Sequence, residues 1–376
     1  MGRTHKHCNK CSEGADLAQI PVEYHTVNTN RTSPFDGSIL RLNVVKISSG
    51  SGRRDVLFIH GYPHAWPLWK NQLASSELAA NYNLYAMDVR GFGQSENPGP
   101  GTASDCPATT TFNANVIADD IYNVITQLGL VNPIVVVHSL AGPLLANFIR
   151  KYGDTGTGGV GGACVKSTSG GPALGGIVLT ATFPAADGQY FSDATLALLG
   201  SGGFFTDNLG ALIPTIKEFA TLSTFCTLNR SDFADVVQMD MTNDLDARIG
   251  VLTIGPPADG NVPVWQSVTV PTLIIEGKKD AVLNPTASAT LARLIPSATF
   301  IPLKCVGHTP QLEVGDKYNR ILENFLDQLP PVNGSRNTRS AKKVVAKVET
   351  KAVLTAAPKA VVKVATKPAN KAVNKW

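Results

Sequence analysis

The sequence lacks the features of several classes of protein. No apolar run approaches the roughly 18 residues that a membrane-spanning helix needs, so no transmembrane segment is expected. The N-terminal stretch MGRTHKHCNKCSEG is polar and basic, with no apolar segment behind it, which predicts that no secretory signal is present. These absences together predict an intracellular, cytoplasmic protein.

Cysteine is scarce, with 6 residues in 376. That number is too low for a disulfide scaffold, and reduced thiols are expected inside a cell. Cys8 and Cys11 form a single CxxC beside His5 and His7, but the second pair of ligands that a zinc site usually needs does not follow. We therefore predict no metal and no cofactor, and a flexible N-terminus over residues 1–30.

The net charge of +4 conceals two unlike parts. Residues 331–376 hold nine Lys and two Arg against one Glu, a balance of +10, so the preceding part carries −6. Lys recurs at every fourth position from Lys343 to Lys375 except at Thr355, and like charges at this spacing oppose a helix. The pattern predicts a disordered basic tail in which residues 341–376 bind nucleic acid or another polyanion; a solubilising tail is the alternative.

Between these ends, short apolar runs alternate with helical patterns. Strands are predicted at 40–47, 55–61, 83–89, 134–138, 176–182, 272–277 and 298–303. Helices are predicted at 65–80, 115–129, 140–153 and 315–329. Buried strands that alternate with helices are typical of a mostly parallel sheet with helices on both faces, and ligands bind at the carboxyl ends of its strands. The fold class is therefore α/β, and the chemistry is expected directly after the strands.

Two stretches interrupt the alternation. Residues 153–176 contain ten glycines, which predicts a mobile surface insertion with little to bury. Residues 184–265 contain helical patterns rich in Phe and Leu, which predict a helical lid inserted over the carboxyl edge of the sheet. The core of the domain is then formed by residues 31–183 and 266–330.

Ser139 stands where the strand IVVVH turns directly into a helix. Such a turn lifts the hydroxyl out of the sheet edge, and small residues are preferred two positions before and after it; here these are Val137 and Ala141. A serine needs a base that is oriented by an acid. Asp280 follows the strand TLIIEG, and His308 follows the strand ATFIPL, so the three residues occur in the order that this topology requires.

Two backbone N–H groups are expected to bind the oxyanion of a tetrahedral intermediate. One belongs to Leu140, at the start of the helix after Ser139. The other belongs to Tyr62, in the loop HGYPHAWPLW after the strand DVLFIH, where Gly61 lets the backbone approach closely.

The segments HGYPHAWPLW, DVRGFGQSENP, HSLAG, GKKDAVLNP and VGHTPQLE resemble the landmarks of the α/β-hydrolase superfamily, in family order, over roughly residues 35–330. The HG-x-P form with a following Trp resembles the branch of epoxide hydrolases and haloalkane dehalogenases. The resemblance implies the α/β-hydrolase fold with a helical lid. Members of that branch use an Asp nucleophile on an alkyl carbon, whereas Ser139 would form an ether there that cannot be hydrolysed.

The predicted function is therefore that of a carboxylesterase-like serine hydrolase. Ser139 attacks the carbonyl of a small or medium apolar ester, His308 moves the proton, and Asp280 orients the imidazole. The alternatives are a carbon–carbon bond hydrolase, a perhydrolase or an epoxide-hydrolase-like enzyme, and, from another class, a weakly active hydrolase-like body tethered to a polyanion by its tail. Neither the substrate's identity nor the oligomeric state is predicted.

Roles outside the catalytic chemistry are expected for the neighbours of this site. His60 and His138 are expected to hydrogen-bond within the loops, and Asp88 and Arg90 to hold the loop beside the site through an ion pair and backbone contacts. Cys305 is expected to be a packed thiol. A series of phenylalanines is expected to form the core of the lid, with a wall of the substrate site as the alternative: Phe204, Phe205, Phe219 and Phe225.

Overall fold

The computed structural model describes residues 11–32, 39–48, 53–99, 111–162 and 165–330 of the chain. The basic tail at 331–376 and the residues His5, His7 and Cys8 lie outside these ranges, so the predictions made for them stay predictions. In the described part, no helix is both long and apolar enough to cross a membrane.

Eight strands form one sheet in the order β1-β2-β4-β3-β5-β6-β7-β8. Pairing is antiparallel between β1 and β2 and between β2 and β4, and parallel from β4 to β8. The strands are β1 Glu23–Thr32, β2 Ile39–Ile47, β3 Arg54–Ile59, β4 Tyr82–Met87, β5 Ile134–His138, β6 Gly176–Thr180, β7 Thr272–Gly277 and β8 Ala298–Leu303. The predicted α/β class is confirmed, and every predicted strand is present.

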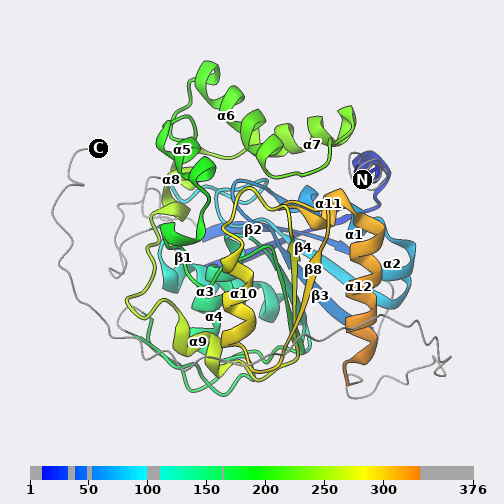
Figure 1. The fold of residues 1–376 in the computed structure, drawn as a ribbon. Coiled ribbons are helices and arrows are strands. Elements are labelled where there is room, and N and C mark those ends of the chain that lie inside the picture. The colour runs from blue at the N-terminus through cyan, green and yellow to red at the C-terminus, as the bar shows by residue number, and fades with distance from the viewer. Residues whose placement is uncertain (1–10, 33–38, 49–52, 100–110, 163–164, 331–376) are drawn as a thin grey trace, which may run out of the picture. The chain divides into compact units, whose positions relative to one another are not determined.

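The position of β5 in the middle of the sheet explains why its sequence is almost entirely apolar. Val135 and Val137 pack into one core cluster, while Ile134 and Val136 pack into the cluster on the opposite face. A parallel strand with helices on both sides has no face that water reaches, so it needs apolar residues at successive positions. Figure 1 shows α3, α4, α9 and α10 on one side of the sheet and α1, α2 and α12 on the other.

The helices are α1 Lys70–Leu73, α2 Ser76–Asn81, α3 Ala114–Gln127, α4 Ala141–Tyr152, α5 Asp193–Gly200, α6 Leu209–Leu222, α7 Arg230–Met241, α8 Leu245–Leu252, α9 Val262–Ser267, α10 Thr286–Leu294, α11 Pro310–Glu313 and α12 Gly315–Gln328. Three short 3-10 helices, η1 Leu17–Gln19, η2 Trp66–Trp69 and η3 Gly188–Tyr190, accompany them. The single helix predicted at 65–80 is instead η2, α1 and α2. It is interrupted where the side chain of Ser75 caps α2 by accepting the N–H of Leu78.

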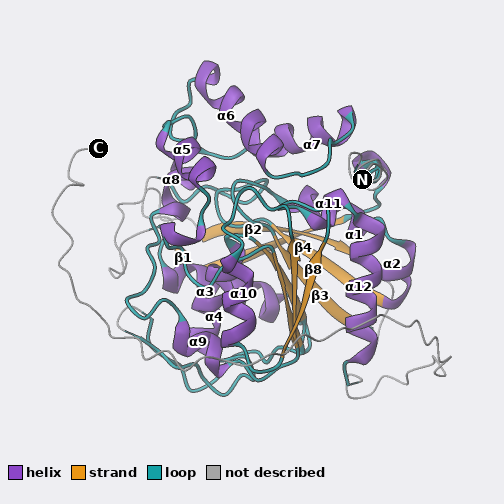
Figure 2. Cartoon of the chain, viewed as in Figure 1, coloured by secondary structure: helices purple, strands orange, loops and turns teal. Residues whose placement is uncertain are grey.

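Helices α5 to α9 form an insertion between β6 and β7, which we call the helical insertion (residues 181–271). In Figures 1 and 2 its helices α5, α6 and α7 lie above the sheet. Phe204 and Phe219 are buried, with their rings packed against each other and against Tyr62 and His64 of the HGYPH loop, whereas Phe205 and Phe225 are exposed.

The N-terminal segment differs from the flexible terminus predicted for residues 1–30. Strand β1 begins at Glu23 and pairs along β2. It was not predicted because its sequence, EYHTVNTNRT, is mostly polar, as an edge strand can be. Cys11 forms a disulfide with Cys226 of the helical insertion, and Cys305 is also disulfide-bonded. The expectations of reduced thiols and of a packed Cys305 thiol are therefore wrong.

The glycine-rich stretch after α4 packs against the end of that helix. The N–H groups of Gly158, Gly161 and Thr168 donate to carbonyls of the last turn of α4. Val165 and Leu174 are buried, so the expectation that this stretch has little to bury is wrong for these two residues. The glycine content did not predict this packing, because it depends on backbone hydrogen bonds. The backbone N–H groups of a following loop can pair with the carbonyls that are left free at the end of a helix.

Candidate active site

Ser139 lies in the sharp turn between β5 and α4. Its φ of 51° places it in the left-handed region, which a residue with a Cβ rarely adopts. Its N–H donates to Thr180 O at 3.0 Å, and its carbonyl accepts Gly142 N–H at 3.0 Å and the hydroxyl of Thr182. Both ends of this residue are therefore held by the backbone and by β6.

Crowding explains the small residues around this turn. A Cβ at Gly142 would lie 2.0 Å from Thr182 Oγ1, so only glycine fits there. Val137 and Ala141, the residues two before and two after Ser139, are both fully buried without exposure to solvent. The turn thus accepts Val at the position where the common motif has Gly.

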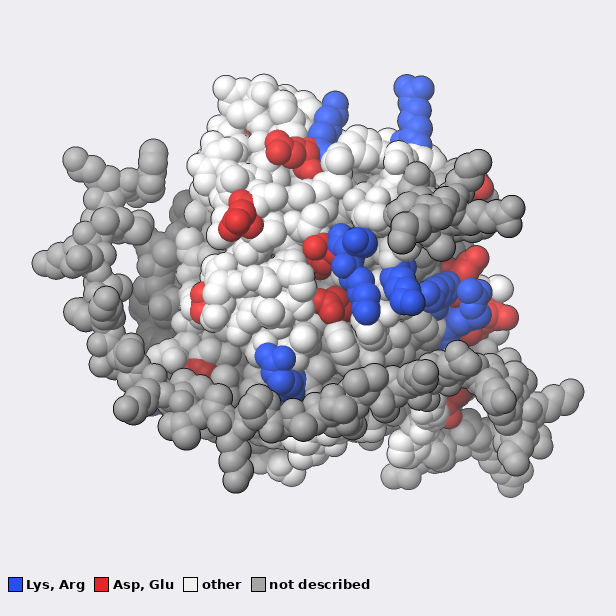
Figure 3. Space-filling view, viewed as in Figure 1, with Lys and Arg blue, Asp and Glu red and all other residues white. Residues whose placement is uncertain are grey.

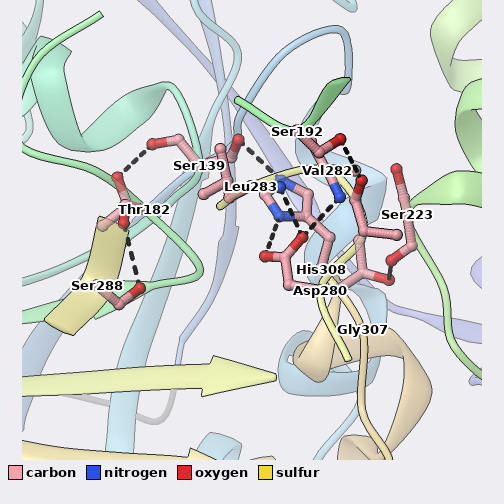
Figure 4. A network of polar contacts seen from close by, with 12 residues as sticks. Ser139, Thr182, Ser192, Ser223, Asp280, Val282, Leu283, Ser288, Gly307 and His308 are labelled. Carbon is pink, nitrogen blue, oxygen red and sulfur yellow. Dashed lines mark hydrogen bonds and ion pairs between the residues drawn. The ribbon is translucent and has the colours of Figure 1, made fainter. Parts of the chain in front are cut away.

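The structure brings Ser139, His308 and Asp280 into one chain of hydrogen bonds (Figure 4). The hydroxyl of Ser139 lies 2.9 Å from His308 Nε2, and His308 Nδ1 lies 2.8 Å from Asp280 Oδ2. The second carboxylate oxygen, Oδ1 of Asp280, accepts the N–H groups of Val282 and Leu283 at 2.8 and 2.9 Å. These bonds fix the carboxylate, which in turn orients the imidazole toward the serine. Such a chain can withdraw a proton from a serine hydroxyl.

The two predicted oxyanion donors border the same serine. A Cβ at Gly61 would lie 2.7 Å from Ser139 Cβ, so the loop that carries Tyr62 packs directly against the turn. Leu140 is the residue that precedes α4. Within the described residues, neither the Tyr62 N–H nor the Leu140 N–H donates to a backbone carbonyl. Both are therefore available to a ligand oxygen.

His60 and His138 hydrogen-bond within the loops, as predicted. His60 Nδ1 donates to Gly61 O at 2.9 Å, and its Nε2 accepts Val89 N–H at 3.0 Å. His138 Nε2 donates to His308 O at 3.0 Å. Burial lowers the pKa of His60 to about 3, and burial and the neighbouring His308 lower the pKa of His138. Both imidazoles are therefore neutral supports of the site.

The predicted ion pair between Asp88 and Arg90 is wrong. Arg90 pairs with Asp120 instead, at 2.5 Å. Asp88 accepts the N–H groups of Trp66 and Gln94 and the amide of Asn43. Burial raises the pKa of Asp88 to about 6. The expected backbone contacts of Asp88 are therefore present, and only the ion pair with Arg90 is not formed.

The sequence analysis missed Glu313, which lies in the same segment as His308. Its Oε1 accepts Gly307 N–H at 2.8 Å, and its Oε2 accepts Phe225 N–H at 2.9 Å and Cys226 N–H. Burial raises the pKa of its carboxyl to about 7. Its position in VGHTPQLE, five residues after His308, was the only signal in the sequence.

Within the described residues, the one group of side chains with metal-ligand spacing is Cys11, Cys226 and Glu313. The cysteines are joined in a disulfide and offer no thiolate, so this group does not fit a metal.

Two small hollows, each with about 10 Å³ of space, border the serine turn. One is lined by Tyr62, Phe92, Leu140, Leu144 and Val251 among others. The other shares Leu140, Leu144 and Val251, and Asn147 and Asn261 also line it. Space next to the Ser139 turn is therefore walled by apolar side chains from both the sheet's helices and the helical insertion.

An eight-stranded, mostly parallel sheet with helices on both faces has the form of the α/β-hydrolase fold. The model of the alpha/beta hydrolase family matches residues 56–321, and the chain belongs to this family. A crystal structure of an esterase from Rhodococcus sp. ECU1013 has a TM-score of 0.64 at 17% identity, with 82% of this chain and 99% of that chain covered. At this identity the likeness concerns the fold.

Curated relatives include epoxide hydrolases. Epoxide hydrolase 3 of Xenopus tropicalis is 26% identical over 303 residues, which cover 75% of this chain and 74% of that protein. Epoxide hydrolase 2 of Siraitia grosvenorii is 30% identical over 117 residues, so the chain spans only 31% of that relative's length. Together with the family match, these relatives place the chain in the α/β-hydrolase superfamily.

Proposed function

We propose that the protein is a serine hydrolase that cleaves a carboxylic ester of a small or medium apolar substrate through an acyl-enzyme. Ser139 Oγ attacks the carbonyl carbon while His308 Nε2 takes its proton. The oxyanion is bound by the N–H groups of Tyr62 and Leu140. His308 then protonates the leaving alcohol, and water releases the acid by the reverse sequence.

The observation that carries this proposal is the 2.9 Å contact between Ser139 Oγ and His308 Nε2. A serine at the end of a strand with no base nearby would be an ordinary polar residue. Here the imidazole is within hydrogen-bonding reach and is itself oriented by Asp280 at 2.8 Å. This pairing supports nucleophilic catalysis by the serine.

The nature of the nucleophile favours an ester over an epoxide as substrate, although curated relatives are epoxide hydrolases. A carboxylate that opens an epoxide forms an ester, which water can hydrolyse. Ser139 would form an ether, and no second step would release it. A serine intermediate turns over when the bond formed is an acyl ester, and this supports acyl transfer.

A fluorophosphonate probe and intact-mass measurement test the proposal. One adduct is expected on the wild type and none on Ser139→Ala, and kcat/KM on a short ester is expected to fall by about 10³- to 10⁶-fold in the variant. Ser297→Ala is a matched control, because Ser297 directly precedes β8, at the strand end opposite to the His308 loop, and its hydroxyl donates to Val270 O. Absence of an adduct on folded wild-type protein would refute the proposal.

The helical insertion is proposed to act as the lid over the substrate. Most of the surface above the sheet is uncharged in Figure 3. Leu196, Phe205 and Leu209, on or between the first helices of the insertion, are exposed. These exposed apolar side chains, together with the apolar lining of the hollow that Tyr62 shares with Leu140, support a substrate with an apolar body.

The disulfides favour an oxidising compartment over the cytoplasmic location predicted from the sequence. The basic tail is proposed to bind a polyanion, because residues 331–376 carry a balance of +10. A gel-shift comparison of the full chain with a form that ends at Leu329 tests the tail. Equal, negligible affinity for DNA in both would refute this part.

A further inference from the structure

Three buried polar atoms without partners lie where the HGYPH loop meets the helical insertion. They are Tyr62 Oη, His64 Nε2 and Asp240 Oδ2, and none has a hydrogen-bond partner among the described residues. Tyr62 is 7% exposed, and His64 and Asp240 are not exposed at all. Buried polar groups are nearly always hydrogen-bonded, so a group of three unpaired atoms in one place requires a reason.

His64 of the HGYPH loop is joined to Asp240 of α7. His64 Nδ1 donates to Asp240 Oδ1 at 2.8 Å. Tyr62 stands two residues before His64, and burial raises the pKa of its hydroxyl, with smaller opposing effects of the charges of Arg248 and Asp240. Aromatic rings of the helical insertion pack against both loop side chains. The ring centroid of Tyr62 lies 5.4 Å from that of Phe204, and the ring centroid of His64 lies 6.0 Å from that of Phe219.

This group borders the proposed reaction centre. The backbone N–H of Tyr62 is a proposed oxyanion donor, and Tyr62 lines the small hollow that it shares with Leu140. On the other side, the ring of His64 lies 5.9 Å from that of His138, the residue before Ser139. A substrate whose carbonyl oxygen is bound by the Tyr62 N–H would therefore lie next to the residue that carries the phenol.

We propose that Tyr62 and the His64–Asp240 pair form a polar subsite that binds a hydroxyl group of the substrate. The inference rests on the proposed function and narrows it to esters that carry a hydroxyl besides the scissile bond. The phenol of Tyr62 donates, because burial raises its pKa and keeps it protonated. His64, with Nδ1–H bound to Asp240, presents Nε2 as an acceptor when neutral and as a donor when protonated.

A hydroxyl group fits this set better than other oxygen groups. It accepts from Tyr62 and donates to His64 at the same time. A ketone oxygen accepts only, so it leaves the Nε2 lone pair of neutral His64 unpaired. A methylene leaves every polar atom of the subsite unpaired, and a site built to bind a hydroxyl rejects an analogue that lacks it.

Matched esters test the subsite. Ethyl butanoate, ethyl 3-oxobutanoate and ethyl 3-hydroxybutanoate vary the acyl side, and butyl acetate and 4-hydroxybutyl acetate vary the alcohol side. For at least one side, kcat/KM of the hydroxy ester is expected to exceed that of the plain ester by about tenfold to a hundredfold, with the oxo ester between them on the acyl side. A ratio of one or less on both sides would overturn the proposal.

Two variants assign the preference to its residues. Tyr62→Phe removes the hydroxyl and keeps the ring, and His64→Asn keeps an N–H toward Asp240 while it removes Nε2. Each is expected to bring the ratio of hydroxy to plain ester close to one, whereas a merely structural role would lower activity on both esters and leave the ratio unchanged. Tyr122→Phe, on α3 and stacked on Tyr152 at 4.7 Å, is the control whose ratio stays as in the wild type.

The probe experiment separates failure of the subsite from failure of the proposed function. If Ser139 is labelled but the enzyme shows no preference for the hydroxy ester, the subsite is refuted and the proposed function is not. If Ser139 is not labelled, calorimetric titration of the wild type with the hydroxy and plain esters takes the place of kinetics. Tighter binding of the hydroxy ester that is lost in Tyr62→Phe supports the subsite, and equal affinity overturns it.

Discussion

Glu313 accepts the backbone N–H of Gly307, the residue directly before His308, at 2.8 Å. Its other oxygen accepts Phe225 N–H and Cys226 N–H of the helical insertion. Two further hydrogen bonds link this segment to the N-terminal segment. Ser12 N–H donates to Glu313 O at 2.9 Å, and Gly315 N–H donates to Ser12 Oγ at 3.2 Å. One buried carboxylate therefore joins the loop of the proposed base to the helical insertion, at the point where the disulfide joins that insertion to the N-terminal segment.

The disulfide is expected to stabilise this connection. Cys11 and Cys226 are 215 residues apart, so their bond closes a long loop in the unfolded chain. Cys226→Ser is expected to lower the free energy of unfolding by roughly 2–5 kcal/mol. Urea unfolding measures the loss.

Cys11→Ser and the double variant are the matched controls for the disulfide. If the two residues act as one unit, either single change and the double change give the same loss. Losses that add would contradict a shared bond, as would equal mobility of the wild type on reducing and non-reducing gels.

Asp280→Asn is expected to reduce ester turnover strongly while the fold is retained. The amide can present an N–H to His308 Nδ1, which would hold the imidazole in the wrong tautomer. The expected loss in kcat is about 10⁴-fold. Steady-state kinetics on a short ester measures it, with Asp193→Asn, an exposed residue at the start of α5, as control. Retention of most activity would assign the acid to another residue.

Gly61→Ala is expected to disturb the proposed oxyanion hole. The new Cβ would lie 2.7 Å from Ser139 Cβ and 2.8 Å from His138 O, so the loop that carries the Tyr62 N–H must move away. Loss of one oxyanion donor costs about 10²- to 10³-fold in kcat, and KM is expected to change less. Gly188→Ala is the control, since a Cβ there meets no atom within 4 Å. A kcat equal to that of the control would place the oxyanion elsewhere.

Glu276→Gln is expected to stabilise the protein at alkaline pH. Burial and the charge of Asp280 raise the pKa of Glu276 from 4.5 to about 7. The folded state therefore holds this proton up to a higher pH than the unfolded state, so the free energy of unfolding falls as the pH rises from about 4.5 to about 7. Above that range the buried charge is a constant penalty, on the order of 1–2 kcal/mol after solvent screening.

Unfolding of the wild type and of Glu276→Gln at pH 4.5, 6 and 8 measures this difference. The gain from the substitution is expected to be largest at pH 8 and to vanish near pH 4.5. A gain that is independent of pH would exclude titration of Glu276 as its cause.

Much of the fold followed from the periodicity of the sequence. The run TLIIEG coincides with β7 because a strand buried on both faces needs unbroken apolar residues. The run ATFIPL coincides with β8, although this strand lies at the edge of the sheet and only its last residue, Leu303, is buried. Strand β1 did not follow, because a polar edge strand has no such signature. The helix predicted at 65–80 was in fact three short pieces, since the fixed turn at Trp66–Trp69 packs against the sheet and overrides the local pattern.

The sequence by itself determined where Ser139, Asp280 and His308 stand, since each directly follows a parallel strand and such strands share one edge. Tertiary structure alone decided which groups hold them. Glu313 with Gly307, His64 with Asp240, and Cys11 with Cys226 are pairs whose partners come from separate elements or distant segments. Periodicity reports only which face of an element is buried, whereas these contacts depend on how the helical insertion and the N-terminal segment pack against the sheet.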